Sequence, residues 1–297
     1  MADNDASTRG IIQSPPEVLL GLIDDAAIYP PGNVPLDEAV RAHFLRRDTA
    51  AQPLVGTFVI GDHRLADLKG LVTDSLAVSI VIGAGAGGIA PALSVAHRIG
   101  GVTPAAVEIA LRDTDDLVGN ARRVVAAVNQ ARDLGLLDDD VAVYVELPQG
   151  EATHGWLGAA DEVAGAELRL KLRTGGVEEH LFPSTAQLGS WITAALDRET
   201  PFKCTAGLHR AARHTGEDGI THHGFLNVLL ATRASLDGAD PSIVQGVLEE
   251  RDAERLAADA RESVGLDALA RTRRWFISFG SCSIDEPEQD LRGLGLL

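Results

Sequence analysis

Short runs of β-branched and other apolar residues alternate with longer amphipathic stretches along nearly the whole chain. Such alternation between a two-residue and a 3.6-residue hydrophobic period predicts strands and helices that follow one another in turn. The predicted strands cover Leu19–Ile28, Leu54–Ile60, Leu76–Ile82, Ala106–Arg112, Val141–Leu147, Glu167–Arg173, Phe202–Leu208 and Trp275–Phe279. The predicted helices cover Leu36–Arg46, His63–Leu71, Ile89–Ile99, Leu117–Leu134, Ala152–Ala164, Ser184–Leu196, Gly224–Leu236, Pro241–Val264 and a closing helix from Pro287.

This pattern predicts an α/β protein built as a single (β/α)8 TIM barrel. Strict strand–helix alternation forces parallel pairing through right-handed crossovers, and eight such units close into a barrel. The first strand could instead be an entry loop, because GLIDDAAIYPPG contains two adjacent acidic residues. The segment from His209 to Arg274 is too long for one crossover, so we expect extra helices between strands seven and eight. We expect one barrel domain over residues 15–297, preceded by a disordered tail over residues 1–14.

Composition narrows the class of protein. Apolar residues make up 45% of the chain and charged residues 23%, as in soluble globular proteins. The net charge of −17 argues against nucleic-acid binding, which depends on phosphate neutralisation by Lys and Arg. The apolar runs are shorter than a membrane span and the N-terminus does not have the pattern of a signal peptide. Only two cysteines occur, without metal-site spacing, so we expect a cytoplasmic protein.

Two lysines occupy matching places in two predicted strands, Lys171 in AELRLKLRTGG and Lys203 in PFKCTAGLH. Burying a lone ammonium in an apolar strand is costly, so such a lysine is either a paired structural ion or a functional amine. Like charges close together lower each other's pKa, and Arg173 shares a strand face with Lys171. We therefore expect a depressed pKa at Lys171, which would make it a nucleophile suited to Schiff-base chemistry.

The polar residues of the other predicted strands also gather near the carboxyl ends, where barrel enzymes carry their chemistry. Glu108 with Arg112, and Glu146 on the following strand, are expected to face the same interior. Asp24 and Asp25, at the end of the first strand, could add a carboxylate to the mouth, or Asp25 only braces Arg112 or Lys171.

Several of these segments resemble motifs of the deoxyribose-phosphate aldolase superfamily. KLRTGG (171–176) is similar to its strand-six KxxTG motif, and FKCTAGLHR (202–210) to its strand-seven motif with a second lysine. FGSCS (279–283) resembles its strand-eight phosphate loop. AVEIALR and VYVELP resemble its fourth and fifth strands, with Glu108 in the place of a proton-relaying aspartate.

The resemblance implies a class I aldolase-like lyase that acts on a small carbonyl compound, phosphorylated or not, without a cofactor or metal. The implied Schiff base forms on Lys171, with Lys203 and Glu108 moving protons and Glu146 orienting the amine or substrate. The sequence permits a homo-oligomer without setting its size. The expected substrate-binding residues are Asp25, Arg112, Arg173, Thr174, Gly175, Gly176, Thr205, Gly207, His209, Gly280 and Ser281.

Three alternatives remain open at the level of sequence. Gly83-x-Gly85-x-x-Gly88 imitates a dinucleotide fingerprint, although it lies far from the N-terminus. A metal-dependent hydrolase or isomerase would use Glu108, Glu146 and the histidines of the 209–223 loop. A non-catalytic barrel would keep its buried charges as a structural network. On the aldolase hypothesis, we expect the segment 205–224 to cover the barrel mouth, with His209 within reach of the pocket.

Overall fold

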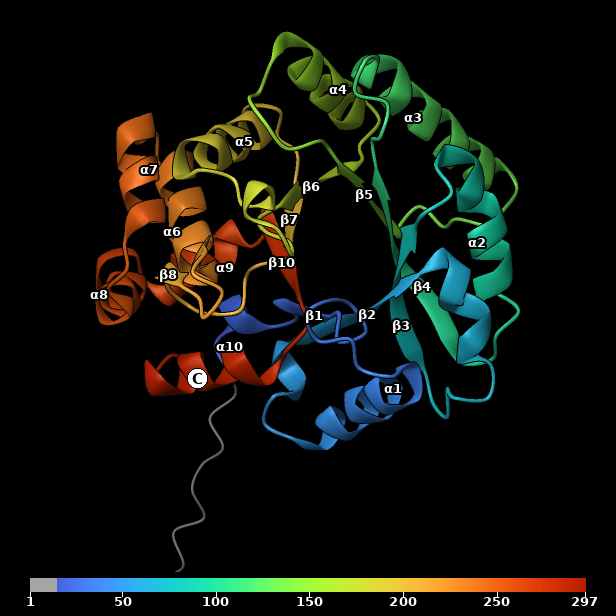
Figure 1. The fold of residues 1–297 in the computed structure, drawn as a ribbon, viewed down its shortest axis with the longest axis horizontal. Coiled ribbons are helices and arrows are strands. Elements are labelled where there is room, and N and C mark those ends of the chain that lie inside the picture. Colours follow the sequence, from blue (N-terminus) through green and yellow to red (C-terminus); the bar gives the residue numbers. More distant parts are fainter. Residues whose placement is uncertain (1–14) are drawn as a thin grey trace, which may run out of the picture.

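The computed structural model describes residues 15–297, and the predicted disordered tail over residues 1–14 lies outside the described residues. Eight parallel strands close into a barrel, in the spatial order β1-β10-β7-β6-β5-β4-β3-β2 (Figure 1). This arrangement confirms the predicted (β/α)8 barrel. The barrel strands are β1 (Ile23–Asp25), β2 (Val55–Gly61), β3 (Leu76–Ile82), β4 (Val102–Ala110), β5 (Ala142–Glu146), β6 (Arg169–Arg173), β7 (Phe202–Thr205) and β10 (Phe276–Ser281).

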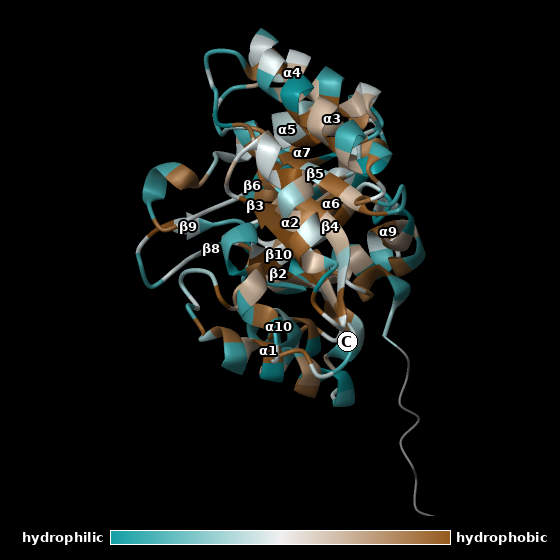
Figure 2. Cartoon of the chain, turned by 90° about the vertical axis from the view of Figure 1, so that its right-hand side faces the viewer, coloured by the Kyte–Doolittle hydropathy of each residue, from teal (hydrophilic) through white to brown (hydrophobic). Residues whose placement is uncertain are grey.

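Helices surround the barrel on its outside. In Figure 2, hydrophobic residues predominate on the barrel strands, whereas the surrounding helices carry many hydrophilic residues. The α-helices are α1 (Leu36–Leu45), α2 (Ile89–Ala96), α3 (Leu117–Asp133), α4 (His154–Gly165), α5 (Thr185–Asp197), α6 (Phe225–Leu236), α7 (Pro241–Glu249), α8 (Ala253–Ala258), α9 (Leu266–Thr272) and α10 (Asp285–Gly293). No helix of the described chain is long and apolar enough to cross a lipid bilayer.

The long connection between β7 and β10 carries the predicted extra helices. It begins with a small antiparallel hairpin, β8 (His214–Thr215) with β9 (Thr221–His222), and continues through α6 to α9. In Figure 1, α7 and α8 lie outside α6, at the edge of the molecule. The sequence predicted one helix over Pro241–Val264, whereas the chain breaks at Glu250, whose backbone is extended, and restarts when Asp252 caps α8.

Two other predicted elements differ from the structure. The predicted helix His63–Leu71 is a 3-10 helix over Asp62–Leu68, and the turn after it contains Gly70 at φ +86°. The predicted first strand, Leu19–Ile28, is only three residues long as β1, because Gly21 at φ +57° turns the chain immediately before it. A left-handed backbone of this kind interrupts an extended strand.

The glycine-rich segment after β3 does not open a dinucleotide-binding sheet. Residues 86–88 form a 3-10 turn before α2, within the barrel. The amides of Gly83 and Ala84 donate to the Asp62 carboxylate at 3.0 and 3.4 Å, so a side chain of the protein itself occupies the loop. The dinucleotide interpretation is therefore wrong.

Candidate active site

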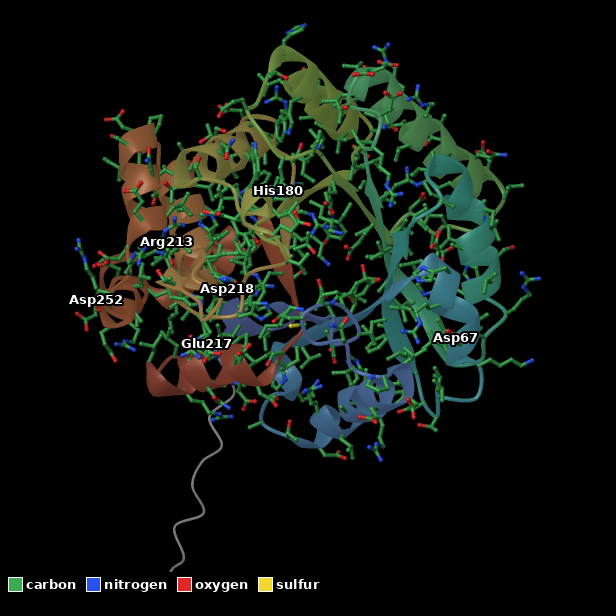
Figure 3. All side chains as sticks on the ribbon, in the orientation of Figure 1. Asp67, His180, Arg213, Glu217, Asp218 and Asp252 are labelled. Carbon is green, nitrogen blue, oxygen red and sulfur yellow. The ribbon has the colours of Figure 1, made fainter. Side chains whose placement is uncertain are left out.

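A cavity of about 530 Å³ lies at the carboxyl ends of the barrel strands. Its floor holds Glu108, Lys171 and Lys203, which project inward from β4, β6 and β7. Apolar side chains form much of its wall, with contributions from Val59, Val81, Val177, Leu181, Tyr29, Pro30 and Pro31. In Figure 3, Asp218 lies at the β8–β9 hairpin beside the barrel, whereas Asp67 and Asp252 lie toward the outer rim.

The two lysines are side by side in the sheet and both are buried. Lys171 pairs with Lys203 in the register of β6 and β7, and their relative exposures are 5% and 1%. Lys171 Nζ lies 2.7 Å from Glu108 Oε2 and 3.0 Å from Glu146 Oε2. Lys203 Nζ lies 2.7 Å from Glu108 Oε1 and 2.5 Å from Asp24 Oδ2. Each ammonium therefore has two carboxylate partners, which compensates for its loss of water.

Asp24 also belongs to this network, although of the two adjacent aspartates only Asp25 was predicted as a substrate-binding residue. Its Oδ2 accepts from Lys203 Nζ and from the Ser278 hydroxyl, at 2.5 and 2.7 Å, and its Oδ1 accepts from the Thr57 amide and hydroxyl, both at 2.8 Å. The signal that could have found it is strand alternation. Of the adjacent Asp24 and Asp25, only one can face the interior.

The ion pairs reverse the pKa shift that we expected for Lys171. Burial lowers its pKa, but the charges of Glu108 and Glu146 outweigh burial and the neighbouring Lys203, so the net pKa is raised. The same balance raises the pKa of Lys203, through Asp24 and Glu108. The expectation of a depressed Lys171 pKa is therefore wrong, because it counted the neighbouring cations and not the nearer carboxylates. At rest, both amines are protonated.

The carboxylates shift in the opposite direction. Burial alone would raise the pKa of Glu108, but the charges of Lys171 and Lys203 hold it well below its usual range. Burial would likewise raise the pKa of Glu146, and Lys171 together with Arg173 lowers it. Arg173 Nε donates to Glu146 Oε1 at 2.7 Å, so this carboxylate joins the amine of Lys171 to the guanidinium of Arg173.

Five of the eleven expected substrate-binding residues do not line the cavity, namely Asp25, Arg112, Thr174, Gly175 and Ser281. The Asp25 carboxylate points outward from β1 and contacts His43 Nδ1 at 3.0 Å and Arg46 Nη1 at 3.4 Å, so it braces α1 rather than Arg112 or Lys171. Arg112 is exposed beyond the end of β4 and does not line the cavity. Both were expected at the mouth because the sequence pattern did not locate the ends of β1 and β4.

The glycines of the turns after β6 and β7 are explained by backbone packing. A Cβ atom on Gly175 would lie 2.9 Å from Gly207 Cα, and one on Gly176 would collide with Leu181. The buried Thr174 hydroxyl donates to the Ala206 carbonyl at 2.5 Å, which ties the two turns together. Gly176, Thr205, Gly207 and Gly280 still line the cavity. The Ser281 hydroxyl donates to the Ser283 carbonyl at 2.7 Å.

The segment after β7 contributes His209, Asp218 and His222 to the cavity wall, as the sequence predicted for His209. His209 Nδ1 lies 3.3 Å from Glu286 Oε2, and burial lowers its pKa. His222 Nε2 lies 3.0 Å from Asp218 Oδ2. The same segment lines a second, wider hollow of about 1140 Å³ toward α8 and α10. Within residues 15–297, no three His, Cys, Asp or Glu side chains are arranged to hold a metal ion.

Tyr29 is a second residue that sequence analysis did not select as functional. It lies in the turn after β1 and lines the cavity, and its hydroxyl is buried without a hydrogen-bond partner in the described structure. Burial and the nearby Glu108 charge raise its pKa, so the phenol keeps its proton. An unpartnered buried hydroxyl is unfavourable, and such groups are candidates for contact with a ligand.

Comparison with known proteins supports the fold. The sequence matches no protein-family model, and no curated protein matches it either. Among solved structures, the chain is similar to deoxyribose phosphate aldolase from Aeropyrum pernix, with a TM-score of 0.53 and 13% identity over 94% of this chain and 93% of that chain. This likeness covers both chains almost completely. At 13% identity it shows that the two chains share the (β/α)8 barrel fold.

Proposed function

We propose that the protein is a class I aldolase-like lyase that makes or breaks a carbon–carbon bond through an imine on Lys171. The observation that carries this proposal is the placement of its lysines. The chain has only three lysines, and two of them, Lys171 and Lys203, are buried together at the floor of the barrel cavity. The third, Lys69, is exposed. Arginine supplies the charge almost everywhere else in this chain, and an arginine cannot form an imine.

Lys171 is the better candidate for the nucleophile because it is the more accessible of the two amines. Its side chain is 6% exposed against 2% for Lys203, which two carboxylates hold at 2.5 and 2.7 Å. Overall, the Lys171 ammonium and a substrate carbonyl give a protonated imine and one water molecule. The C–N bond forms as the carbonyl oxygen leaves with two ammonium protons. The cationic imine then accepts electrons from the adjacent carbon–carbon or carbon–hydrogen bond that breaks.

Glu108 is suited to move the protons that this sequence requires. It contacts both amines, and its low pKa favours short-lived rather than stable protonation. Lys203 keeps Glu108 ionised, and Asp24 balances the charge of Lys203. Glu146 orients Lys171 and Arg173. Of the expected substrate-binding residues, we retain for direct contact Arg173, Gly176, Thr205, Gly207, His209 and Gly280, which line the cavity.

We also propose that the protein works as a homo-oligomer in a reducing cytoplasm. The neighbouring aldolase structure is described as tetrameric, and both cysteines of this chain, Cys204 and Cys282, are free thiols. Light scattering at several protein concentrations measures the mass of the assembly, and a monomer at all of them would contradict the oligomer.

Borohydride trapping tests the proposed imine. Wild-type protein is incubated with a panel of small aldehydes and ketones, reduced, and examined by intact mass and peptide mapping. We expect one adduct on Lys171, none in Lys171→Arg, and an unchanged adduct in Lys69→Arg, which alters an exposed lysine with the same chemistry. An adduct on Lys203 would exchange the two roles. Absence of any adduct would favour a structural ion network.

A further inference from the structure

Arg173 presents unused hydrogen-bond donors to the cavity. Its Nε is engaged with Glu146 Oε1 at 2.7 Å, but its two Nη atoms have no hydrogen-bond or ion-pair partner in the described part of the chain. The side chain is 33% exposed and lines the cavity wall. A guanidinium edge with free donors matches a planar carboxylate in a two-point interaction.

The other cations around the cavity are already engaged. Lys171 and Lys203 each have two carboxylate partners within 3.0 Å. Arg173 shares one carboxylate with Lys171, so it is the cation of the floor and wall best placed to bind an anionic group of a substrate. Because only one guanidinium has free donors, we expect the substrate to carry one negative charge at this place.

The position of Arg173 relative to Lys171 limits where that negative charge lies on the substrate. Both side chains contact the same carboxylate, Glu146, through its two oxygens at 2.7 and 3.0 Å. The amine and the guanidinium are therefore neighbours across one carboxylate. When a substrate carbon is bonded to Lys171 Nζ, an anion attached to that carbon or to the next atom therefore lies on the side of Arg173.

Much of the remaining wall of the cavity is apolar, apart from His209, Asp218 and His222 of the segment after β7. Val59, Val81, Val177 and Leu181 line its wall. The close approach of Gly175 to Gly207 accounts for glycine in the turns after β6 and β7 without any bound anion. A carboxylate adjacent to the reacting carbonyl is the anion that this geometry favours over a phosphate at the far end of a longer chain.

We propose that the carbonyl substrate of this site is a short 2-oxo acid whose carboxylate is bound by Arg173 Nη1 and Nη2. The proposal rests on the proposed function, because it assumes that the substrate carbonyl carbon forms an imine with Lys171. The ammonium of Lys171 and the 2-oxo group condense to a protonated imine and water. The substrate carboxylate then lies beside that cation and stabilises it.

Borohydride trapping of matched carbonyl compounds tests this substrate class on the wild-type protein. The probes are pyruvate, methyl pyruvate, which lacks the charge, acetaldehyde, and glyceraldehyde 3-phosphate. We expect pyruvate to label Lys171 at concentrations about tenfold or more below the other three, as one charge-assisted hydrogen-bonded pair allows. Equal labelling by all four, or stronger labelling by the phosphorylated aldehyde, would overturn the 2-oxo acid while leaving the imine in place.

An arginine variant isolates the proposed contact. Arg173→Gln should remove the preference for pyruvate over methyl pyruvate, and Arg173→Lys should restore only part of it. The control is Arg122→Gln on α3, which removes an exposed arginine paired with Glu162 and should leave the preference unchanged. A preference that survives in Arg173→Gln would contradict the role of Arg173.

Equilibrium binding separates this proposal from the imine. Oxamate has the carboxylate and carbonyl of a 2-oxo acid but does not form an imine, and its binding is measured by calorimetry. If oxamate binds to the wild type and not to Arg173→Gln, the carboxylate contact is supported. If, in addition, no probe labels a lysine, the lyase proposal fails while the carboxylate contact stands. Equal oxamate binding by both proteins, or binding by neither, would overturn the contact.

Discussion

Glu108 bridges Lys171 and Lys203, with Oε2 2.7 Å from one Nζ and Oε1 2.7 Å from the other. Oε1 also accepts from the Ser79 hydroxyl at 2.6 Å. The proton affinities of the two amines are therefore linked through one carboxylate. A change that frees Glu108 from one lysine strengthens its hold on the other, so the residues titrate as a group rather than singly.

Removing the charge of Glu108 should make Lys171 a better nucleophile at lower pH. Glu108→Gln takes away a carboxylate that raises the pKa of Lys171, while burial and Lys203, which lower that pKa, stay in place. We expect the pH at which imine labelling rises to fall by about one unit or more. The measurement is the pH dependence of borohydride labelling with a saturating carbonyl probe.

Ser79→Ala is the matched control for this charge effect. It removes a hydrogen bond to the same Glu108 oxygen but leaves the carboxylate ionised. Its pH profile of labelling should follow that of the wild type. Identical profiles for Glu108→Gln and wild type would show that Glu108 does not hold the Lys171 proton.

The same substitution should change how stability depends on pH. The folded-state pKa of Glu108 is depressed, so its contribution to stability is present above the unfolded pKa of about 4.3 and is lost as pH falls toward the folded value. Glu108→Gln also leaves two buried ammonium groups short of a partner, which costs about 3–5 kcal/mol near neutral pH. The free energy of unfolding is measured with urea between about pH 3 and pH 8, a range that includes the unfolded carboxylate pKa. We expect it to fall less steeply toward acid pH in the variant than in the wild type. Parallel curves would contradict the ion-pair account.

Much of the barrel could be predicted from sequence because its hydrophobic pattern is regular. The predicted range of β3, Leu76–Ile82, agrees with the structure at both ends, and β7 begins at the predicted Phe202 but ends earlier, at Thr205. The prediction was poorest at β1, where a left-handed Gly21 shortens the strand. Local backbone conformation of this kind leaves no periodic signal.

The four central charged residues of the site could be predicted from the sequence, but their electrostatics could not. Glu108, Glu146, Lys171 and Lys203 were brought together by strand alternation alone. Asp25 was predicted as the site residue instead of its neighbour Asp24, the partner of Lys203, because two adjacent aspartates do not show which of them faces the interior when the strand ends are uncertain. The pKa of Lys171 depends on distances of 2.7 and 3.0 Å to carboxylates on two other strands, which spacing along one chain does not contain.

The hydroxyl of Tyr29 should contribute to ligand binding and not to folding. It has no partner in the described structure, so Tyr29→Phe should leave the free energy of unfolding unchanged or slightly higher. The matched control is Tyr144→Phe, since the Tyr144 hydroxyl accepts from Arg169 Nη1 at 3.1 Å and its loss should cost about 1 kcal/mol. Urea unfolding compares the stability of the two variants. The probe concentration that gives half-maximal labelling should rise for Tyr29→Phe and stay unchanged for Tyr144→Phe. A destabilised Tyr29→Phe would show that its hydroxyl has a structural partner.

His223 should make the segment after β7 sensitive to acid. Its ring is buried, with Nε2 2.8 Å from the Pro183 carbonyl and Nδ1 3.0 Å from Arg213 Nη1. Since Arg213 can only donate, Nδ1 accepts, Nε2 carries the proton, and the ring is neutral. Burial lowers the pKa of His223 to about 4, so its contribution to stability is complete above the unfolded pKa of about 6.5 and is lost as pH falls toward 4.

Protonation of His223 would place a second cation against the Arg213 guanidinium and loosen the segment that carries His209 and His222 to the cavity. We expect His223→Gln to flatten the fall in stability between the unfolded and folded pKa values, whereas His180→Gln, at an exposed histidine, should not. Nitrogen chemical shifts of the labelled imidazole measure the tautomer and the pKa directly. A His223 ring that titrates at its unfolded pKa, or that carries its proton on Nδ1, would contradict this assignment, because Arg213 would then have no acceptor.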